Sequence, residues 1–156
     1  MQTVLFFLIR SKLSVEKEKP MAAPKLRVLY SEDDLDNREF ICLILAQEGF
    51  ETVCPKNSKD VLTIAKEARF DAYLLDSWTP GMSGLELCKR IREFDTHTPI
   101  IFYSGAAYAE DEDAARAAGA QAYITKPSGW DEVVDAIREA ISNSQAVRAS
   151  CSEVSI

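Results

Sequence analysis

From Lys25 onward, short runs of β-branched and aliphatic residues alternate with longer amphipathic segments, and this alternation constrains the fold most. Each amphipathic segment carries apolar residues at the three- and four-residue spacing of a helix. The apolar runs predict five strands, at Leu26–Ser31, Phe50–Cys54, Asp71–Asp76, Pro99–Tyr103 and Ala122–Thr125. This β/α alternation predicts an α/β fold, a doubly wound (βα)5 parallel sheet that helices cover on both faces as a three-layer sandwich.

The same pattern divides the chain into three parts. Residues 25–142 are expected to form one folded domain. Residues 1–24 precede the first strand and include a second methionine, Met21, so we expect either a disordered extension or a mis-assigned start. Residues 143–156 contain four serines and are expected to be a flexible C-terminal tail.

Polar residues before the apolar segments predict where the helices begin. Asp36 and Glu39 stand in capping-box spacing in the first helical segment. Ser58 precedes the second helical segment and Ser128 the last, so both serines are predicted N-caps.

The charge balance and the cysteines exclude several classes of function. The 156 residues include 18 Lys+Arg and 25 Asp+Glu, a net charge of −7, whereas a nucleic-acid-binding face must be basic. The apolar run Val4–Ile9 is too short to cross a bilayer, so no membrane insertion is expected. The four cysteines form no C-x-x-C motif, which favours reduced thiols in a cytoplasmic protein over a disulfide framework or a zinc site.

Acidic or polar residues stand where four of the predicted strands end. They are Glu32, Asp33 and Asp34 after the first strand, Asp76 at the third, Ser104 at the fourth and Lys126 at the fifth. In a sheet of order 2-1-3-4-5 these ends lie side by side, where parallel sheets bind their ligands. Clustered carboxylates repel unless a cation joins them, and oxygen ligands with open positions favour Mg²⁺. The pattern therefore predicts a pocket for a phosphoryl group beside a carboxylate nucleophile.

Together these residues resemble the receiver domain of two-component response regulators. The run Glu32-Asp33-Asp34 is similar to the family's acidic cluster, and Asp76 begins the segment DSWTPGMSG, which matches its D-x-x-x-P-G-M-x-G phosphoacceptor loop. Three further matches are Ser104-Gly105, Lys126-Pro127 and the switch aromatic Tyr123. The resemblance covers residues 25–142 and implies a flavodoxin-like fold with strand order 2-1-3-4-5.

The resemblance implies a chemical role for each pocket residue. Asp76 is expected to accept a phosphoryl group from a phosphohistidine on a sensor histidine kinase or a histidine phosphotransfer protein. Asp33, Asp76 and the backbone carbonyl of Trp78 are expected to hold Mg²⁺, with Glu32 acting through a metal-bound water. Lys126 and the metal are expected to offset the charge on the phosphoryl oxygens.

The resemblance also implies a switch. Ser104 is expected to move toward the phosphoryl group while Tyr123 rotates inward, changing the face made by the fourth helix, fifth strand and fifth helix. A downstream target protein is expected to bind that face. Because few residues follow the last helix, we expect a stand-alone receiver that acts mainly as a signalling switch in the cytoplasm.

Two positions depart from the commonest pattern of the family. Trp78, two residues after the acceptor, and Ala106, two residues after Ser104, both lack the polar group that could orient an attacking water. The bulk of Trp78 is also expected to shield the acyl phosphate. Slow self-dephosphorylation is therefore predicted.

Two other functions stay open from the sequence. The first is a degenerate receiver that acts as a phosphorylation-independent docking module, and the intact set Asp33, Asp76, Ser104 and Lys126 argues against it. The second is a phosphatase with an aspartyl-phosphate intermediate, which usually carries an acid two residues after its nucleophile, where this chain has Trp78.

Overall fold

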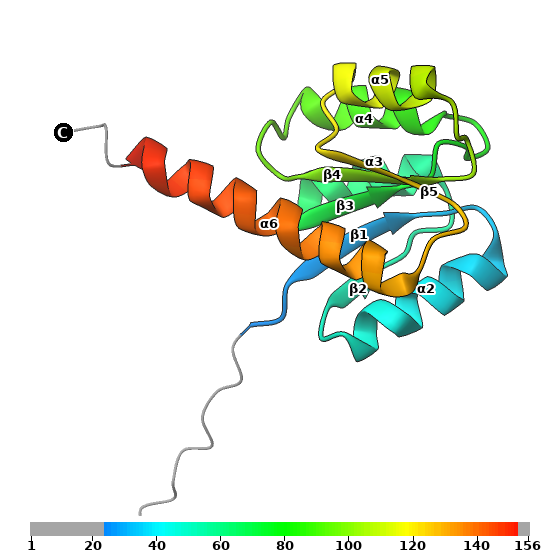
Figure 1. Ribbon diagram of the computed structural model, residues 1–156, viewed down its shortest axis with the longest axis horizontal. Helices are drawn as coiled ribbons and strands as arrows, with labels where there is room; N and C mark the ends of the chain where they lie inside the picture. Colours follow the sequence, from blue (N-terminus) through cyan, green and yellow to red (C-terminus); the bar gives the residue numbers. More distant parts are fainter. Residues whose placement is uncertain (1–23, 153–156) are drawn as a thin grey trace, which may run out of the picture.

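The computed structural model describes residues 24–152, and these form one parallel sheet between two layers of helices (Figure 1). The strands are β1 (Arg27–Ser31), β2 (Glu51–Val53), β3 (Ala72–Leu75), β4 (Ile100–Ser104) and β5 (Ala122–Thr125). The helices are α2 (Leu35–Gln47), α3 (Ser58–Glu67), α4 (Gly84–Arg92), α5 (Ala109–Ala117) and α6 (Trp130–Ser152). The strand order β2-β1-β3-β4-β5 confirms the predicted doubly wound fold.

Alternating side chains of the central strands enter two separate cores. Val28 of β1 and Leu74 of β3 pack with α2 and α6 on one face of the sheet. Leu29 and Leu75, their neighbours in sequence, pack with α3, α4 and α5 on the other face. Because both faces are covered, the central strands carry apolar residues at nearly every position, as a parallel sheet requires.

The residues that begin the helices differ from those predicted. Asp34 caps α2, its side chain accepting a 2.8 Å hydrogen bond from the Asn37 N–H, so the predicted box of Asp36 and Glu39 is wrong. Asn57 caps α3 in place of Ser58, and its side chain accepts from the Asp60 N–H at 3.0 Å. Several adjacent polar residues suit a cap, and the backbone path selects one of them.

Helix α6 is longer than the sequence suggested. It begins at Trp130 and not at a cap on Ser128, whose buried hydroxyl has no hydrogen-bond partner among the described residues. It then continues to Ser152, so the prediction of a flexible tail is wrong for residues 143–152. Two of the serines in this part of the helix donate hydrogen bonds, Ser144 to the His97 carbonyl and Ser150 to the Val147 carbonyl, both at 2.9 Å. The predicted extension at residues 1–23 and the end of the tail lie outside the described residues.

One pair of cysteines contradicts the expectation of reduced thiols. Cys42 of α2 is joined by a disulfide to Cys54, which follows β2. The fold lays α2 over β2, so it brings together two cysteines whose separation of 12 residues matches no disulfide or metal motif. Cys88, which is buried, and Cys151, which is exposed, remain free thiols. Within the described part of the chain, no helix combines the length and the apolar content needed to cross a bilayer.

Candidate phosphoryl-transfer site

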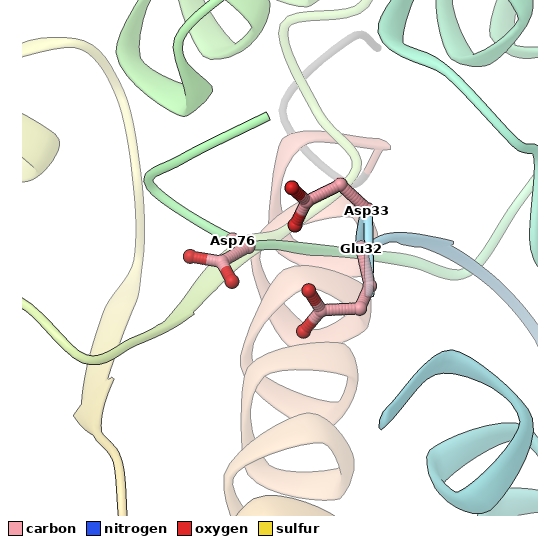
Figure 2. A group of neighbouring side chains, drawn as sticks. All are labelled: Glu32, Asp33 and Asp76. Atoms are coloured by element: carbon pink, nitrogen blue, oxygen red, sulfur yellow. The ribbon is translucent and has the colours of Figure 1, made fainter. Parts of the chain in front are cut away.

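Three carboxylates converge at the carboxyl ends of β1 and β3, next to each other in the sheet. Glu32 and Asp33 follow β1, and Asp76 follows β3. One oxygen from each carboxylate lies within 4.8 Å of the others, and Figure 2 shows the three side chains as close neighbours. Glu32 and Asp76 are buried while Asp33 is exposed, so the cluster is open to solvent on one side.

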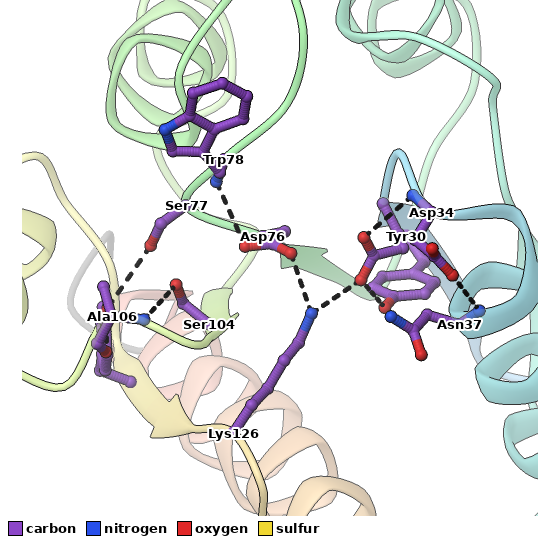
Figure 3. A network of polar contacts seen from close by, with 11 residues as sticks. Tyr30, Asp34, Asn37, Asp76, Ser77, Trp78, Ser104, Ala106 and Lys126 are labelled. Carbon is purple, nitrogen blue, oxygen red and sulfur yellow. Dashed lines mark hydrogen bonds and ion pairs between the residues drawn. The ribbon is translucent and has the colours of Figure 1, made fainter.

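Lys126 reaches into this cluster from the end of β5. Its Nζ donates to Glu32 Oε2 at 2.7 Å and to Asp76 Oδ2 at 2.9 Å (Figure 3). Lys126 Nζ also lies 4.9 Å from the ring centroid of Tyr103. One ammonium group among three carboxylates leaves the pocket with an excess of negative charge.

The pKa values of the pocket residues follow from this crowding. Burial lowers the pKa of Lys126, but its bonds to Asp76 and Glu32 outweigh burial and raise the pKa above its ordinary value. Burial likewise raises the pKa of Glu32, and the bonds from Lys126 and the Tyr30 hydroxyl outweigh it and lower that pKa. Partial desolvation and the neighbouring Glu32 raise the pKa of Asp33, and no salt bridge to a described residue compensates for them. Asp33 is therefore the carboxylate that a bound cation relieves most.

The backbone of the loop after β3 packs closely against Asp76 and Ser77. The Trp78 N–H donates to Asp76 Oδ1 at 3.2 Å, and the Gly84 N–H donates to the Ser77 carbonyl at 3.0 Å. A Cβ atom at position 84 would overlap the Asp76 carbonyl oxygen, which explains the glycine that ends the motif. The indole of Trp78 is 76% exposed and points away from the Asp76 carboxylate (Figure 3).

Ser104 and Tyr123 lie on the side of the pocket formed by β4 and β5. The Ser104 hydroxyl accepts from the Ala106 N–H at 3.2 Å, and the Tyr123 hydroxyl donates to the Ala106 carbonyl at 2.9 Å. The Tyr123 ring stacks on Phe102 with centroids 5.8 Å apart. Both predicted switch residues therefore hold the same short loop after β4, one at each side of the Ala106 backbone.

The arrangement matches a known family. The family model for the response regulator receiver domain matches residues 28–138. The chain belongs to this family. The relative DivK, a polar-differentiation response regulator of Brucella anthropi, is 33% identical over 117 residues, 74% of this chain and 94% of DivK. The chain spans about half the length of the curated transcriptional and DNA-binding regulators that it also matches.

Solved receiver structures share the fold. A CheY-like receiver from Methanospirillum hungatei is 26% identical, with a TM-score of 0.75 over 79% of this chain and 98% of the other. The receiver domain of the sensor histidine kinase PA1611 from Pseudomonas aeruginosa is 24% identical, with a TM-score of 0.71 over 76% of this chain and 99% of the other. That second structure holds a magnesium ion coordinated in its active site cleft.

The residues that meet at the carboxylate cluster are the ones predicted from the sequence, but a residue that supports them was not predicted. All of Glu32, Asp33, Asp76 and Lys126 come together as expected. Tyr30 was missed, although its hydroxyl donates to Glu32 Oε2 at 3.0 Å. An available signal was its place on β1 two residues before Glu32, since residues two apart on a strand share a face.

Proposed function

We propose that this receiver accepts a phosphoryl group on Asp76 from a phosphohistidine of a partner protein and thereby switches a protein-binding surface. The observation that carries the proposal is the bond from Lys126 to Asp76 in a pocket of three converging carboxylates. In the transfer, an Asp76 oxygen forms a bond to phosphorus while the phosphorus–nitrogen bond breaks and the imidazole leaves with the electron pair.

The donor set of the pocket fits Mg²⁺. Carboxylate and carbonyl oxygens are hard ligands, and the spacing of the three carboxylates suits a single small cation with open positions for water or phosphate. Asp33, Asp76 and the Trp78 carbonyl would hold the ion, and Glu32 would act through a metal-bound water. When bound, Mg²⁺ supplies positive charge that stabilises the phosphoryl oxygens.

Lys126 has two roles in the proposal. In the unphosphorylated receiver it pairs with Asp76 and Glu32, which holds the acceptor carboxylate in place. During transfer its ammonium group stabilises the negative charge that develops on the phosphoryl oxygens. Ser104 then donates its hydroxyl to the phosphoryl group, and its loop and Tyr123 move with it.

The surface beside the pocket supports the choice of partner. Helix α2 begins two residues after Asp33 and exposes the large apolar side chains Leu35, Phe40 and Leu43. An exposed apolar face next to the acceptor favours docking of a phosphodonor protein, a sensor histidine kinase or a histidine phosphotransfer protein. The face formed by α5, β5 and α6, the fourth helix, fifth strand and fifth helix of the chain, is the proposed site for the downstream target, in the cytoplasm.

Two observations favour this function over the alternatives. A phosphorylation-independent docking module does not need a buried Glu32 and Asp76 paired to Lys126, an arrangement that is costly unless it serves chemistry. A phosphatase of this kind usually carries a carboxylic acid at position 78, and the exposed indole there cannot act as a general acid or base.

A direct test is incubation of the protein with Mg²⁺ and a small acyl-phosphate donor, followed by intact-mass spectrometry. The wild-type protein is expected to gain one base-labile phosphoryl group, and Asp76→Asn is expected to gain none. Asp71→Asn is the matched control, because Asp71 precedes β3 at the opposite end of the sheet and should leave labelling unchanged. Labelling of Asp76→Asn, or an unlabelled wild type, would contradict the proposal, and rapid turnover of phosphate esters would support the phosphatase.

A further inference from the structure

Two buried hydroxyl groups fasten the loop between Asp76 and Gly84, which we call the acceptor loop, to helix α3. Ser58 is the first residue of α3 and is 2% exposed, and Thr79 of the acceptor loop is 8% exposed. Their hydroxyl oxygens lie 2.7 Å apart, and Thr79 Oγ1 lies 2.5 Å from the Met82 carbonyl oxygen. These contacts join residues 21 positions apart in the sequence.

Chemistry fixes the direction of this hydrogen-bond chain. The Met82 carbonyl oxygen only accepts, and it lies 2.5 Å from Thr79 Oγ1 and 3.5 Å from Ser58 Oγ, so the Thr79 hydroxyl hydrogen goes to Met82 through the much shorter contact. Thr79 Oγ1 is then left as an acceptor, and Ser58 donates to it. The chain therefore runs from Ser58 through Thr79 to the Met82 carbonyl. It closes the Pro80-Gly81 turn, where Gly81 has a φ of +86° that favours glycine.

Thr79 is part of the peptide unit whose carbonyl is a proposed Mg²⁺ ligand. The Trp78 carbonyl belongs to the peptide bond between Trp78 and Thr79, so an anchor on Thr79 holds one end of that rigid planar unit. The other side of Trp78 is held by its own N–H, which donates to Asp76 Oδ1 at 3.2 Å. The residues that flank this carbonyl are thus held by Asp76 on one side and, through Thr79, by Ser58 and Met82 on the other.

We propose that Ser58 and Thr79 are positioning residues that hold the Trp78 backbone carbonyl toward the carboxylate cluster and so set the affinity of the pocket for Mg²⁺. Neither side chain touches the ion in this proposal. The inference rests on the proposed function, because it assigns a purpose to the loop geometry only if the cluster binds the ion.

The test is a Mg²⁺ titration of the full chain, followed by intrinsic tryptophan fluorescence, in which the midpoint and not the amplitude is compared. Thr79→Val keeps the shape of the side chain and removes the hydrogen-bond chain, so we expect the midpoint to rise about tenfold. Thr79→Ser restores the hydroxyl and is expected to return the midpoint to within about twofold of wild type. Ser58→Ala leaves the bond from Thr79 to Met82 intact, so a rise of only about threefold is expected.

A matched control separates positioning from general stability. Thr98 is also buried and precedes β4 at the opposite end of the sheet, so Thr98→Val removes a buried hydroxyl far from the pocket. We expect Thr98→Val to lower the melting temperature without moving the Mg²⁺ midpoint. In metal-free protein, amide hydrogen exchange over residues 77–82 should accelerate in Thr79→Val and stay at the wild-type rate in Thr98→Val.

Two outcomes would overturn the inference: a Thr79→Val midpoint within about twofold of wild type, or a Thr79→Ser midpoint as weak as that of Thr79→Val. If the wild-type protein shows no Mg²⁺ response and no labelling of Asp76, the proposed function fails instead. Because Ser58 and Thr79 act in one chain, Ser58→Ala combined with Thr79→Val should be no weaker than Thr79→Val alone.

Discussion

The charged side chains at the two ends of the sheet differ in how completely they are paired. At the amino end, Arg92 of α4 donates to the carbonyls of Asp95, Thr98 and Gly119 and to the Gln121 side chain, over distances of 2.8–3.1 Å. Asp95 accepts from the N–H groups of His97 and Thr98 and from the Tyr73 hydroxyl. Each charged group there is surrounded by partners that satisfy it.

At the carboxyl end, Lys126 pairs with Glu32 and Asp76, whereas Asp33 forms no salt bridge among the described residues. Acidic and basic side chains that are fully paired at the amino end are therefore incompletely paired at the carboxyl end. The difference indicates that the amino end holds the fold together, while the carboxyl end keeps an electrostatic repulsion that a bound cation can relieve.

The largest expected effect is the loss of Arg92. Replacement by Met keeps much of the apolar stem but leaves buried carbonyls without donors, so we expect a loss of about 3 kcal/mol in the free energy of unfolding. Denaturant unfolding measures the change. Arg90 lies two residues earlier on α4 and pairs with Glu86 on the exposed face, so Arg90→Met should change stability little. Equal losses in the two variants would remove the contrast between the ends.

The next effect lies in the pocket and has the opposite sign in metal-free protein. Asp33→Asn removes a carboxylate that forms no salt bridge within residues 24–152, so the metal-free variant should melt at a higher temperature than wild type. It should also bind Mg²⁺ about tenfold more weakly, because one ligand has lost its charge.

The control for Asp33 is its neighbour. Asp34→Asn makes the same change of charge, and asparagine also caps helices well, so α2 and the Mg²⁺ midpoint should be unaffected. A lower melting temperature for metal-free Asp33→Asn would show that the cluster is not under repulsion.

A smaller effect concerns pH at the amino end. Burial raises the pKa of Asp95, but hydrogen bonds from Thr98, His97 and Tyr73 outweigh burial and lower the pKa below its ordinary value. A lowered carboxyl pKa stabilises the fold above the unfolded pKa of about 4, and this contribution is lost as the pH falls through the folded pKa. Wild-type stability should therefore fall more steeply below about pH 4 than that of Asp95→Asn in acid unfolding curves. Tyr73→Phe, which removes one of the hydrogen bonds, should lie between the two curves.

The smallest expected effect concerns the lifetime of the acyl phosphate. Trp78→Asn places an amide near the acceptor that can orient an attacking water, so self-dephosphorylation should accelerate about threefold. Trp78→Phe keeps an aromatic side chain without a polar group and should retain the wild-type rate. The decay of labelled protein after removal of the donor measures both. An unchanged rate in Trp78→Asn would show that the exposed indole has no influence on hydrolysis.

The sequence predicts the sheet and the pocket well because both depend on local patterns. Alternate burial of Val28 and Leu29 follows from a continuous apolar run, and the strand ends bring Asp33, Asp76 and Lys126 together once the strand order is known. Capping is less predictable, because Asn57 and Ser58 suit a cap equally and only the tertiary contact with Thr79 removes Ser58 from that role.

Contacts between side chains on different helices, strands and loops can hardly be predicted from the sequence. The hydroxyl chain from Ser58 to Thr79 and the disulfide between Cys42 and Cys54 both need the three-dimensional arrangement before they can be recognised. The end of α6 was missed for another reason. Serines near residue 143 suggest a tail, but the alanines, Gln145 and Arg148 among them favour a helix, and this preference prevails.

Because α6 is long, a small tilt at its first turn would displace its far end much more than its base. Its first residue, Trp130, lies against Tyr103, whose ring contacts Lys126, so the base of the helix stands close to the pocket. With 23 residues at 1.5 Å each, the helix is about 34 Å long. A tilt of about 5° at the base would carry the far end through about 3 Å.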